Sequence, residues 1–193
     1  MSNSGKFREH CEQLAAKARR LTGLMLRTFH SRQSTVILPV YKSLIRPLLE
    51  YATAIWSPHY RSDIKEIESV QEYVTRRIQG LSKFNYSTRL STLRLSTLEN
   101  RRSYFDLVEC HKLLHGVVRC HCREQLQLSR TNNDYNTRGH QYKLIPITSK
   151  LDVRCHFFTE RVVNSWNSLP PEIAHILDHA RFKWELRNHL QAY

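Results

Sequence analysis

The spacing of the apolar residues constrains the fold of this chain more than any other feature of its sequence. Over much of the chain they recur at every third or fourth position, which is the spacing of one face of an α-helix. Only 5 Gly and 6 Pro occur among 193 residues, so few helix breakers interrupt these stripes. We therefore predict a predominantly α-helical fold. The clearest stripe consists of Ile64, Ile67, Val70, Val74 and Ile78.

Capping signals predict where the helix that carries this stripe begins and ends. Ser62 or Asp63 can cap its start, and Glu66 lies three residues after Asp63, as in a capping box. Gly80 can adopt the left-handed backbone that ends a helix. The sequence therefore predicts one well-bounded helix over residues 63–80.

A helix before this one, with a wide apolar face, is predicted to pack against it. That face includes Leu44 and Leu48, and Pro47 should kink or end the helix because proline lacks a backbone N–H. We expect Leu44 and Leu48 to cover three residues of the later stripe, namely Val70, Val74 and Ile78. Two tryptophans among apolar helix positions, Trp56 and Trp166, are predicted to anchor the core.

The same patterns divide the chain into four segments. A long helix begins near Ser96, which forms a second capping box with Glu99, and it ends at Gly116. After Gly116 the helical period fades, and a short extended segment around Leu144 is the only predicted β element. The predicted bounds are 1–81 for a helical bundle, 82–116 for a long connecting helix region, 117–150 for a basic loop and 151–193 for a smaller carboxy-terminal helical unit.

The charge of the chain indicates a polyanionic partner. It has 30 Lys+Arg against 17 Asp+Glu, a formal net charge of +13 and a pI of about 9.9. The excess is spread along the chain rather than confined to one tail. Nucleic acid is the commonest polyanion and the partner that we favour. The alternative is a basic protein whose charges serve only its solubility.

Two further features of composition bear on where the protein works. No run of about 18 apolar residues is present, so the sequence predicts no membrane span. The 5 Cys are odd in number and do not have the spacing of a disulfide framework. A reducing, intracellular environment is therefore the better interpretation.

Seven blocks of sequence carry a resemblance to a known family. The first reads YKSLIRPLLEYATAIWSP and spans residues 41–58. The others follow in the family's order, at 68–80, 98–102, 112–116, 137–140, 157–170 and 182–190. The ordered set resembles the region after the catalytic palm in reverse transcriptases of jockey-type non-LTR retrotransposons. The resemblance implies that the helical bundle is a polymerase thumb, followed by the carboxy-terminal region, and it is compatible with a nuclear location.

The resemblance implies no polymerase chemistry on this chain itself. Such polymerases hold two Mg²⁺ ions on paired palm carboxylates, and this sequence contains no Asp-Asp pair. The nearest mimic, Tyr104-Phe105-Asp106, lies in a helical pattern, and we interpret it as helix core with one solvated acid. The fingers, palm and endonuclease of the family would precede Met1. We therefore expect no enzyme activity and no cofactor, since the Mg²⁺ would belong to the absent palm.

The resemblance also implies which basic residues contact nucleic acid. A thumb holds the primer–template duplex by its backbone, so Lys and Arg would contact phosphates without reading sequence. The predicted duplex contacts are Arg46, Arg76, Arg77, Arg101 and Arg102. The alternative is that each arginine pair lies on a solvated helix face and contacts no nucleic acid.

A second set of basic residues suggests single-strand binding. Arg138, His140 and Lys143 alternate with Tyr135 and Tyr142. Tyrosine rings can stack on unpaired bases while cations meet phosphates. These three basic residues are the predicted single-strand contacts, and the alternative is an ordinary basic loop.

A zinc site is the metal alternative that the sequence raises. Cys and His are the ligands of tetrahedral Zn²⁺, and thirteen positions hold six of them: Cys110, His111, His115, Cys120, His121 and Cys122. However, Cys110 and His111 lie inside the predicted long helix, and the gap between Cys120 and Cys122 is shorter than zinc motifs use. We therefore predict no metal site.

Together these features predict a nucleic-acid-binding thumb and carboxy-terminal fragment of an RNA-directed DNA polymerase. In a full-length protein it would clamp template RNA and primer DNA. On its own it should bind RNA and RNA–DNA hybrid weakly and without sequence specificity. The alternative is a non-catalytic protein-interaction module or a decayed transposon relic with no retained activity.

Overall fold

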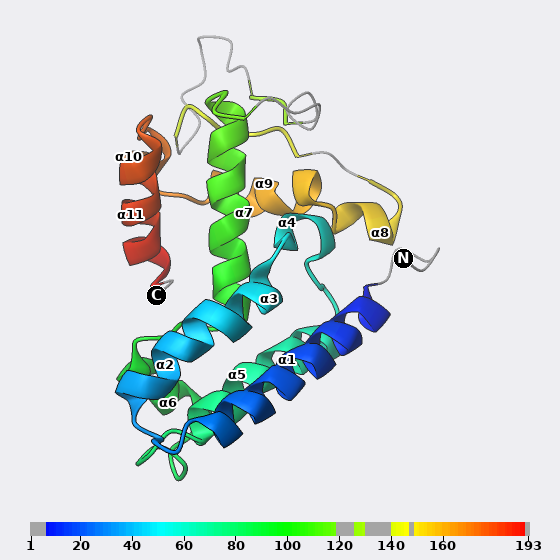
Figure 1. The fold of residues 1–193 in the computed structure, drawn as a ribbon. Helices are drawn as coiled ribbons and strands as arrows, with labels where there is room; N and C mark the ends of the chain where they lie inside the picture. The colour runs from blue at the N-terminus through cyan, green and yellow to red at the C-terminus, as the bar shows by residue number, and fades with distance from the viewer. Residues whose placement is uncertain (1–6, 119–125, 130–139, 147–148, 192–193) are drawn as a thin grey trace. The chain divides into compact units, whose positions relative to one another are not determined.

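The described part of the protein is predominantly helical, as the sequence predicts (Figure 1). The chain divides into two compact units, residues 1–102 and residues 103–192. None of the helices in the described ranges is both long and apolar enough to cross a membrane. The computed structural model describes residues 7–118, 126–129, 140–146 and 149–191.

The first unit is built around two long helices, α1 and α5, which lie side by side (Figure 1). A continuous helical rod formed by α2, η1 and α3 packs on α1. The elements of this unit are α1 (Arg8–Thr28), α2 (Ser34–Val40), η1 (Tyr41–Ile45), α3 (Arg46–Glu50), α4 (Thr53–Trp56), α5 (Arg61–Arg76), α6 (Tyr86–Leu93) and the start of α7 (Leu98–Leu114).

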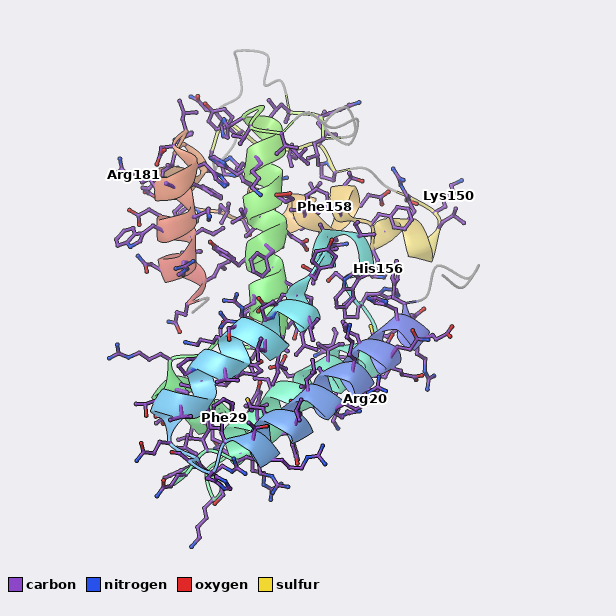
Figure 2. All side chains as sticks on the ribbon, in the orientation of Figure 1. Arg20, Phe29, Lys150, His156, Phe158 and Arg181 are labelled. Atoms are coloured by element: carbon purple, nitrogen blue, oxygen red, sulfur yellow. The ribbon has the colours of Figure 1, made fainter. Side chains whose placement is uncertain are left out.

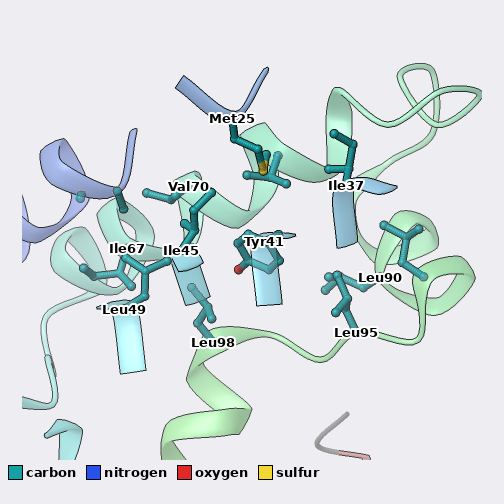
Figure 3. Close-up of a cluster of buried hydrophobic side chains, with 14 of the residues drawn as sticks. Met25, Ile37, Tyr41, Ile45, Leu49, Ile67, Val70, Leu90, Leu95 and Leu98 are labelled. Carbon is teal, nitrogen blue, oxygen red and sulfur yellow. The ribbon is translucent and has the colours of Figure 1, made fainter. Parts of the chain in front are cut away.

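The stripe predicted on α5 does face the core. Val70, Val74 and Ile78 are each at most 2% exposed, which confirms the predicted burial. The predicted partners are wrong, because Leu44 is 61% exposed and Leu48 is only half-buried. The helix instead turns Ile37, Tyr41, Ile45 and Leu49 inward (Figure 3).

A π-turn explains this change of face. Residues Tyr41–Ile45 form η1, and the backbone N–H of Arg46 donates to the carbonyl of Tyr41, five residues back. The inward residues are four apart, and in a regular α-helix each such step would drift by about 40° around the axis. The wider π-turn reduces that drift. Pro47 explains why the π-turn lies at this point of the helix. A proline ring crowds the carbonyl four residues before it, which here is that of Ser43 inside η1.

The capping box predicted at the start of α5 is wrong. Helix α5 begins at Arg61 after Tyr60, and no side chain caps it. Asp63 lies in its first turn, and Glu66 accepts a hydrogen bond from Arg19 of α1 at 2.7 Å instead. Thr97 contributes a side-chain cap at the start of α7. The Thr97 hydroxyl oxygen accepts from the backbone N–H of Asn100 at 3.1 Å.

The first unit extends beyond the boundary predicted at residue 81. Helix α6 and the start of α7 place four leucines in the same core as Tyr41 and Val74. These leucines are Leu90, Leu93, Leu95 and Leu98. Because this core holds α6 in place, the division falls at Arg102, and the predicted connecting region 82–116 is shared between the units.

The second unit packs its helices around Trp166, which is fully buried as predicted. Its one β feature in the described ranges is an antiparallel bridge between Leu128 and Leu144, in agreement with the small β element expected. The side-chain amide of Asn167 both donates to and accepts from the backbone of Leu144, each at 2.8 Å. Besides most of α7, the elements are α8 (Asp152–Cys155), α9 (Phe158–Asn167), α10 (Pro171–Ala174) and α11 (His179–Leu190).

Candidate nucleic-acid interface

Two of the predicted contact residues lie where a phosphate can reach them. Arg76 and Arg77 are exposed at the end of α5. The guanidinium carbon of Arg77 lies 4.8 Å from the centre of the Tyr73 ring, a cation–π contact that orients it. The sequence therefore placed this arginine pair correctly on the surface, next to the buried stripe.

Arg101 and Arg102 do not lie on the surface, so the prediction that they face a duplex is wrong. They are 8% and 3% exposed, because the first turn of α7 belongs to the core of the first unit. Arg101 donates twice to the carboxylate of Glu50, with Nη2 to Oε2 at 2.9 Å.

Arg46 belongs to the same internal network. Its Nε lies 3.7 Å from Oε1 of Glu50, and its side chain is 15% exposed. Glu50 thus holds two arginines, which ties α3 to α7 within the first unit. A phosphate would have to displace Glu50 to engage either arginine, so this network is structural.

The predicted single-strand segment is also corrected. His140 is 3% exposed, and its Nε2 lies 3.0 Å from the carbonyl oxygen of Trp166. Burial lowers the pKa of His140. Lys143 is half-buried, and its carbonyl accepts from the backbone N–H of Ser129 at 2.7 Å beside the β-bridge. His140 therefore packs inside the second unit, while Arg138 and Tyr135 lie outside the described residues.

A basic cavity that the sequence did not reveal lies in the first unit. It has a volume of about 660 Å³. Four of its seven lining residues are arginines and none is acidic. The lining residues, which we call the arginine pocket, are Arg20, Gly23, Leu26, Arg27, Arg32, Tyr73 and Arg77.

Helix α1 supplies one wall of the arginine pocket. Arg20, Gly23 and Arg27 are three and four residues apart, so they share one face of the helix (Arg20 is labelled in Figure 2). A Cβ placed on Gly23 would meet nothing within 4 Å. The missing side chain therefore leaves open space between two guanidinium groups.

The other positive groups reach the arginine pocket from the segment after α1 and from α5. Arg32 donates to the carbonyl oxygens of Leu26, in the last turn of α1, and of Phe29, its C-cap residue, which fixes its guanidinium at the end of that helix. Arg77 is held over Tyr73. The pocket is thus formed by residues that are far apart in the sequence.

The arginines of the pocket differ from their neighbours in having no acidic partner. Among the described residues, no carboxylate pairs with Arg20, Arg27 or Arg77. In contrast, Arg8 and Arg19 on the same helix α1 pair with Glu12 at 2.9 Å and Glu66 at 2.7 Å. The pocket therefore concentrates uncompensated positive charge.

Sequence reasoning could have found only part of this site. Arg20 and Arg27 are seven residues apart, a spacing that puts them on one face of a helix. Nothing in the sequence joins them to Arg77. Their convergence depends on the packing of α1 on α5.

The cysteine and histidine residues weighed as zinc ligands are used for packing where they are described. Cys110 and His111 are fully buried in α7. His111 Nε2 lies 2.8 Å from the carbonyl oxygen of Ile176, and its Nδ1 lies 3.3 Å from Nδ1 of His179. In the described ranges no group of three or more His, Cys, Asp or Glu could hold a metal ion. Cys120, His121 and Cys122 lie outside those ranges.

Comparisons with known proteins identify no family for this chain. No model of a protein family matches it. No solved structure matches it either. Uncharacterized protein B0403.1 of Caenorhabditis elegans is 24% identical over 113 residues, which cover 57% of this chain and 57% of that protein. The match thus spans little more than half of that relative, and the resemblance to reverse transcriptases stays a prediction.

Proposed function

We propose that this chain binds nucleic acid through phosphate contacts, with the arginine pocket and the adjoining Arg76 as the contact surface of its first unit. The observation that carries the proposal is the convergence of four arginines around one cavity without an acidic residue in its lining. Guanidinium groups match phosphate oxygens in geometry and stay charged at any relevant pH. A polyanion is the ligand that this arrangement favours most.

The chemistry of the surface supports backbone contacts rather than base readout. Phosphate contacts position a protein on nucleic acid and carry no sequence information of their own. The exposed side chains that line the arginine pocket are three arginines, Arg20, Arg27 and Arg77, and the aromatic Tyr73. We therefore expect weak binding to RNA and RNA–DNA hybrid, with little sequence preference and strong salt dependence.

The resemblance to jockey-type reverse transcriptases gives this surface a role. In that framework the first unit is a thumb, which would clamp template RNA and primer DNA against a palm on another part of a longer protein. The support for this role is the ordered set of sequence blocks together with a helical unit that carries an arginine pocket. We propose that the isolated chain does not extend primers, because it has no paired palm carboxylates. Primer extension that is abolished by a mutation within this chain would contradict this.

Binding can be tested by fluorescence anisotropy across a salt series. Replacing both Arg76 and Arg77 with Gln should lower affinity for all duplexes alike. Each lost phosphate contact should reduce the slope of log affinity against log salt by about 0.9 on duplex and about 0.7 on single strands. A double variant, Arg61→Gln with Lys65→Gln, removes the same charge from exposed positions at the opposite end of α5 and serves as the control.

The alternative, an interaction module or relic without nucleic-acid binding, makes the opposite prediction. In that case the two double variants would have equal slopes and equal affinities. A folded protein with that behaviour would leave Arg76 and Arg77 as solvated surface and would refute the proposed function.

A further inference from the structure

We propose that the arginine pocket accepts the phosphate monoester at the end of a nucleic-acid strand, in preference to the phosphodiesters within it. This inference rests on the proposed function and names the chemical group that the pocket selects. Its basis is the convergence of the cations. A row of cations follows a backbone, whereas four guanidinium groups that line one open hollow can engage several oxygens of a single group.

The charge of the pocket matches a dianion better than a monoanion. Four guanidinium groups line one cavity of about 660 Å³, and Arg20, Arg27 and Arg77 have no carboxylate partner among the described residues. Like charges around one cavity repel one another, because their interaction falls only as the inverse of distance. A phosphodiester brings one negative charge, whereas a terminal phosphate brings roughly 1.5 to 2 at neutral pH and three acceptor oxygens.

The donors are held in place before a ligand arrives. Arg32 is tied to the carbonyls of Leu26 and Phe29, and Arg77 is stacked on Tyr73 at 4.8 Å. Fixing a side chain in advance reduces the entropy lost on binding. Arg20 and Arg27 are exposed and can close on the ligand from α1.

The pocket also has room for the group. Its volume lies within the range of roughly 300 to 1,000 Å³ in which proteins bind small ligands. Gly23 contributes to this space, since a Cβ there would meet no atom within 4 Å. The absence of a Cβ at this position therefore gives a way to fill the pocket without changing its charge.

The test compares a strand that carries a 5′-phosphate with a 5′-hydroxyl strand one nucleotide longer, so that both carry the same number of phosphates. Fluorescence anisotropy on the full chain should give an affinity on the order of tenfold higher for the 5′-phosphate strand, equivalent to about 1.4 kcal/mol. Gly23→Leu should lower the affinity for the 5′-phosphate strand more than that for the 5′-hydroxyl strand, and so abolish this preference. Circular dichroism should show that the helix content of this variant is kept or raised, because leucine favours helix more than glycine.

A second variant guards against an unexpected effect of the leucine. Arg20→Gln with Arg27→Gln removes two exposed cations of the pocket and should also reduce the preference. Inorganic phosphate is the competitor that separates a strand end from a free anion. If it competes at the concentrations at which the strand binds, the site takes small phosphates and the strand-end assignment is overturned.

The outcomes separate this inference from the proposed function. Equal affinity for the two strands, or a preference that survives Gly23→Leu, would overturn the terminal-phosphate site. The proposed function would still stand if Arg76→Gln with Arg77→Gln reduced the salt slope. If neither strand bound at all, both would fall.

Discussion

The buried polar groups of the first unit, residues 1–102, include a network of a carboxyl, an amide and phenols, whereas those of the second unit, residues 103–192, include four imidazoles. In the first unit Gln71 is at the centre. Its Oε1 accepts from the Tyr41 hydroxyl at 2.8 Å, and its Nε2 donates to the Tyr86 hydroxyl at 2.9 Å and the Ser96 carbonyl at 3.0 Å. The Tyr86 hydroxyl in turn donates to Glu68.

In the second unit four histidines occupy the corresponding role, and we call them the histidine cluster. His111 is stacked on Phe182, with ring centres 4.0 Å apart. Its Nε2 donates to the carbonyl of Ile176, so its Nδ1 must be the acceptor for the N–H of His179 when both rings are neutral. Burial lowers the pKa of all four, and that of His111 falls to about 4. The members of the cluster are His111, His115, His140 and His179.

The two interiors therefore respond to acid in opposite directions. Burial raises the pKa of Glu68, so this carboxylate binds a proton more readily in the folded first unit than in the unfolded chain. Acid therefore reduces the free-energy cost of burying it. In the second unit the buried histidines bind protons less readily when folded than when unfolded. Acid therefore lowers the free energy of unfolding of this unit. Glu68 and the histidine cluster thus make opposite contributions to the pH dependence of stability.

Placing a charge in the core of the first unit should have the largest effect. Val74 is fully buried, so Val74→Asp either buries an unpaired carboxylate or neutralises it, at a cost of about 4 kcal/mol or more. Leu44→Asp is the matched control, because Leu44 is 61% exposed and its substitution should reduce stability little. Hydrogen exchange read by mass spectrometry would show loss of protection in the first unit only. Equal effects of the two substitutions would mean that the face of η1 has been assigned wrongly.

Breaking the buried ion pair of the second unit should come next. Arg161 of α9 donates to Asp106 of α7 from Nε at 2.9 Å and from Nη2 at 2.8 Å. Asp106→Asn leaves the guanidinium without its counter-charge and should cost about 3 kcal/mol. Chemical denaturation followed by hydrogen exchange should place the loss in residues 103–192. A loss in residues 1–102 instead would show that the two interiors are not independent.

Acid should destabilise the second unit by a smaller amount. With a pKa near 6.5 in the unfolded chain and about 4 in the fold, His111 contributes stability that is complete above about pH 7 and declines as the pH falls through 6.5 towards 4. The loss should reach about 2 kcal/mol near pH 5. His111→Gln keeps an N–H near the position of Nε2 and cannot take up a proton, so its stability should change less with pH.

The other charged groups near the histidine cluster define the control for this experiment. After burial, Lys183 and Lys112 further lower the pKa of His179, while Glu109 and Asp178 raise it. Lys183→Gln should therefore make His179 easier to protonate without touching His111. A pH profile identical in the wild-type protein and His111→Gln would show that His111 is not the group responsible.

Filling the gap at Gly23 should have the smallest effect, and it should be favourable. Glycine inside a helix costs roughly 0.5 to 1 kcal/mol relative to alanine, and a Cβ at this position meets nothing within 4 Å. Gly23→Ala should raise the stability of the first unit by about that amount, measured by thermal unfolding. A decrease would mean that the space beside Gly23 is already filled.

The local elements of this fold were predictable, and the contacts between them were not. Gly80 and Gly116 adopt left-handed backbone at φ values of 81° and 70°, because their positions follow apolar stripes that end there. Trp56 and Trp166 are buried as their neighbours indicate. Arg101 and Arg102 look like any exposed pair in sequence, and only the packing of α7 against α3 shows that they are internal.

The same limit applies to the candidate site. Arg76 and Arg77 could be recognised as surface residues because they lie at the end of the helix that carries the stripe, at positions outside the stripe. The other arginines of the pocket are joined to them only by the contact between α1 and α5, which periodicity does not specify. His140 was misjudged because a basic segment without a helical period gives no sign of the buried Trp166 that it contacts.

The π-turn at Tyr41–Ile45 has a consequence for comparing this chain with its relatives. A π-turn corresponds to one residue inserted into an α-helix. With one residue fewer between Tyr41 and Ile45, the inward positions would have the spacing of a regular helix, and the same four side chains would still face the core. A relative that aligns here with a single-residue gap would therefore keep this core intact. Such a gap inside a helix would record an insertion or deletion that the fold absorbs.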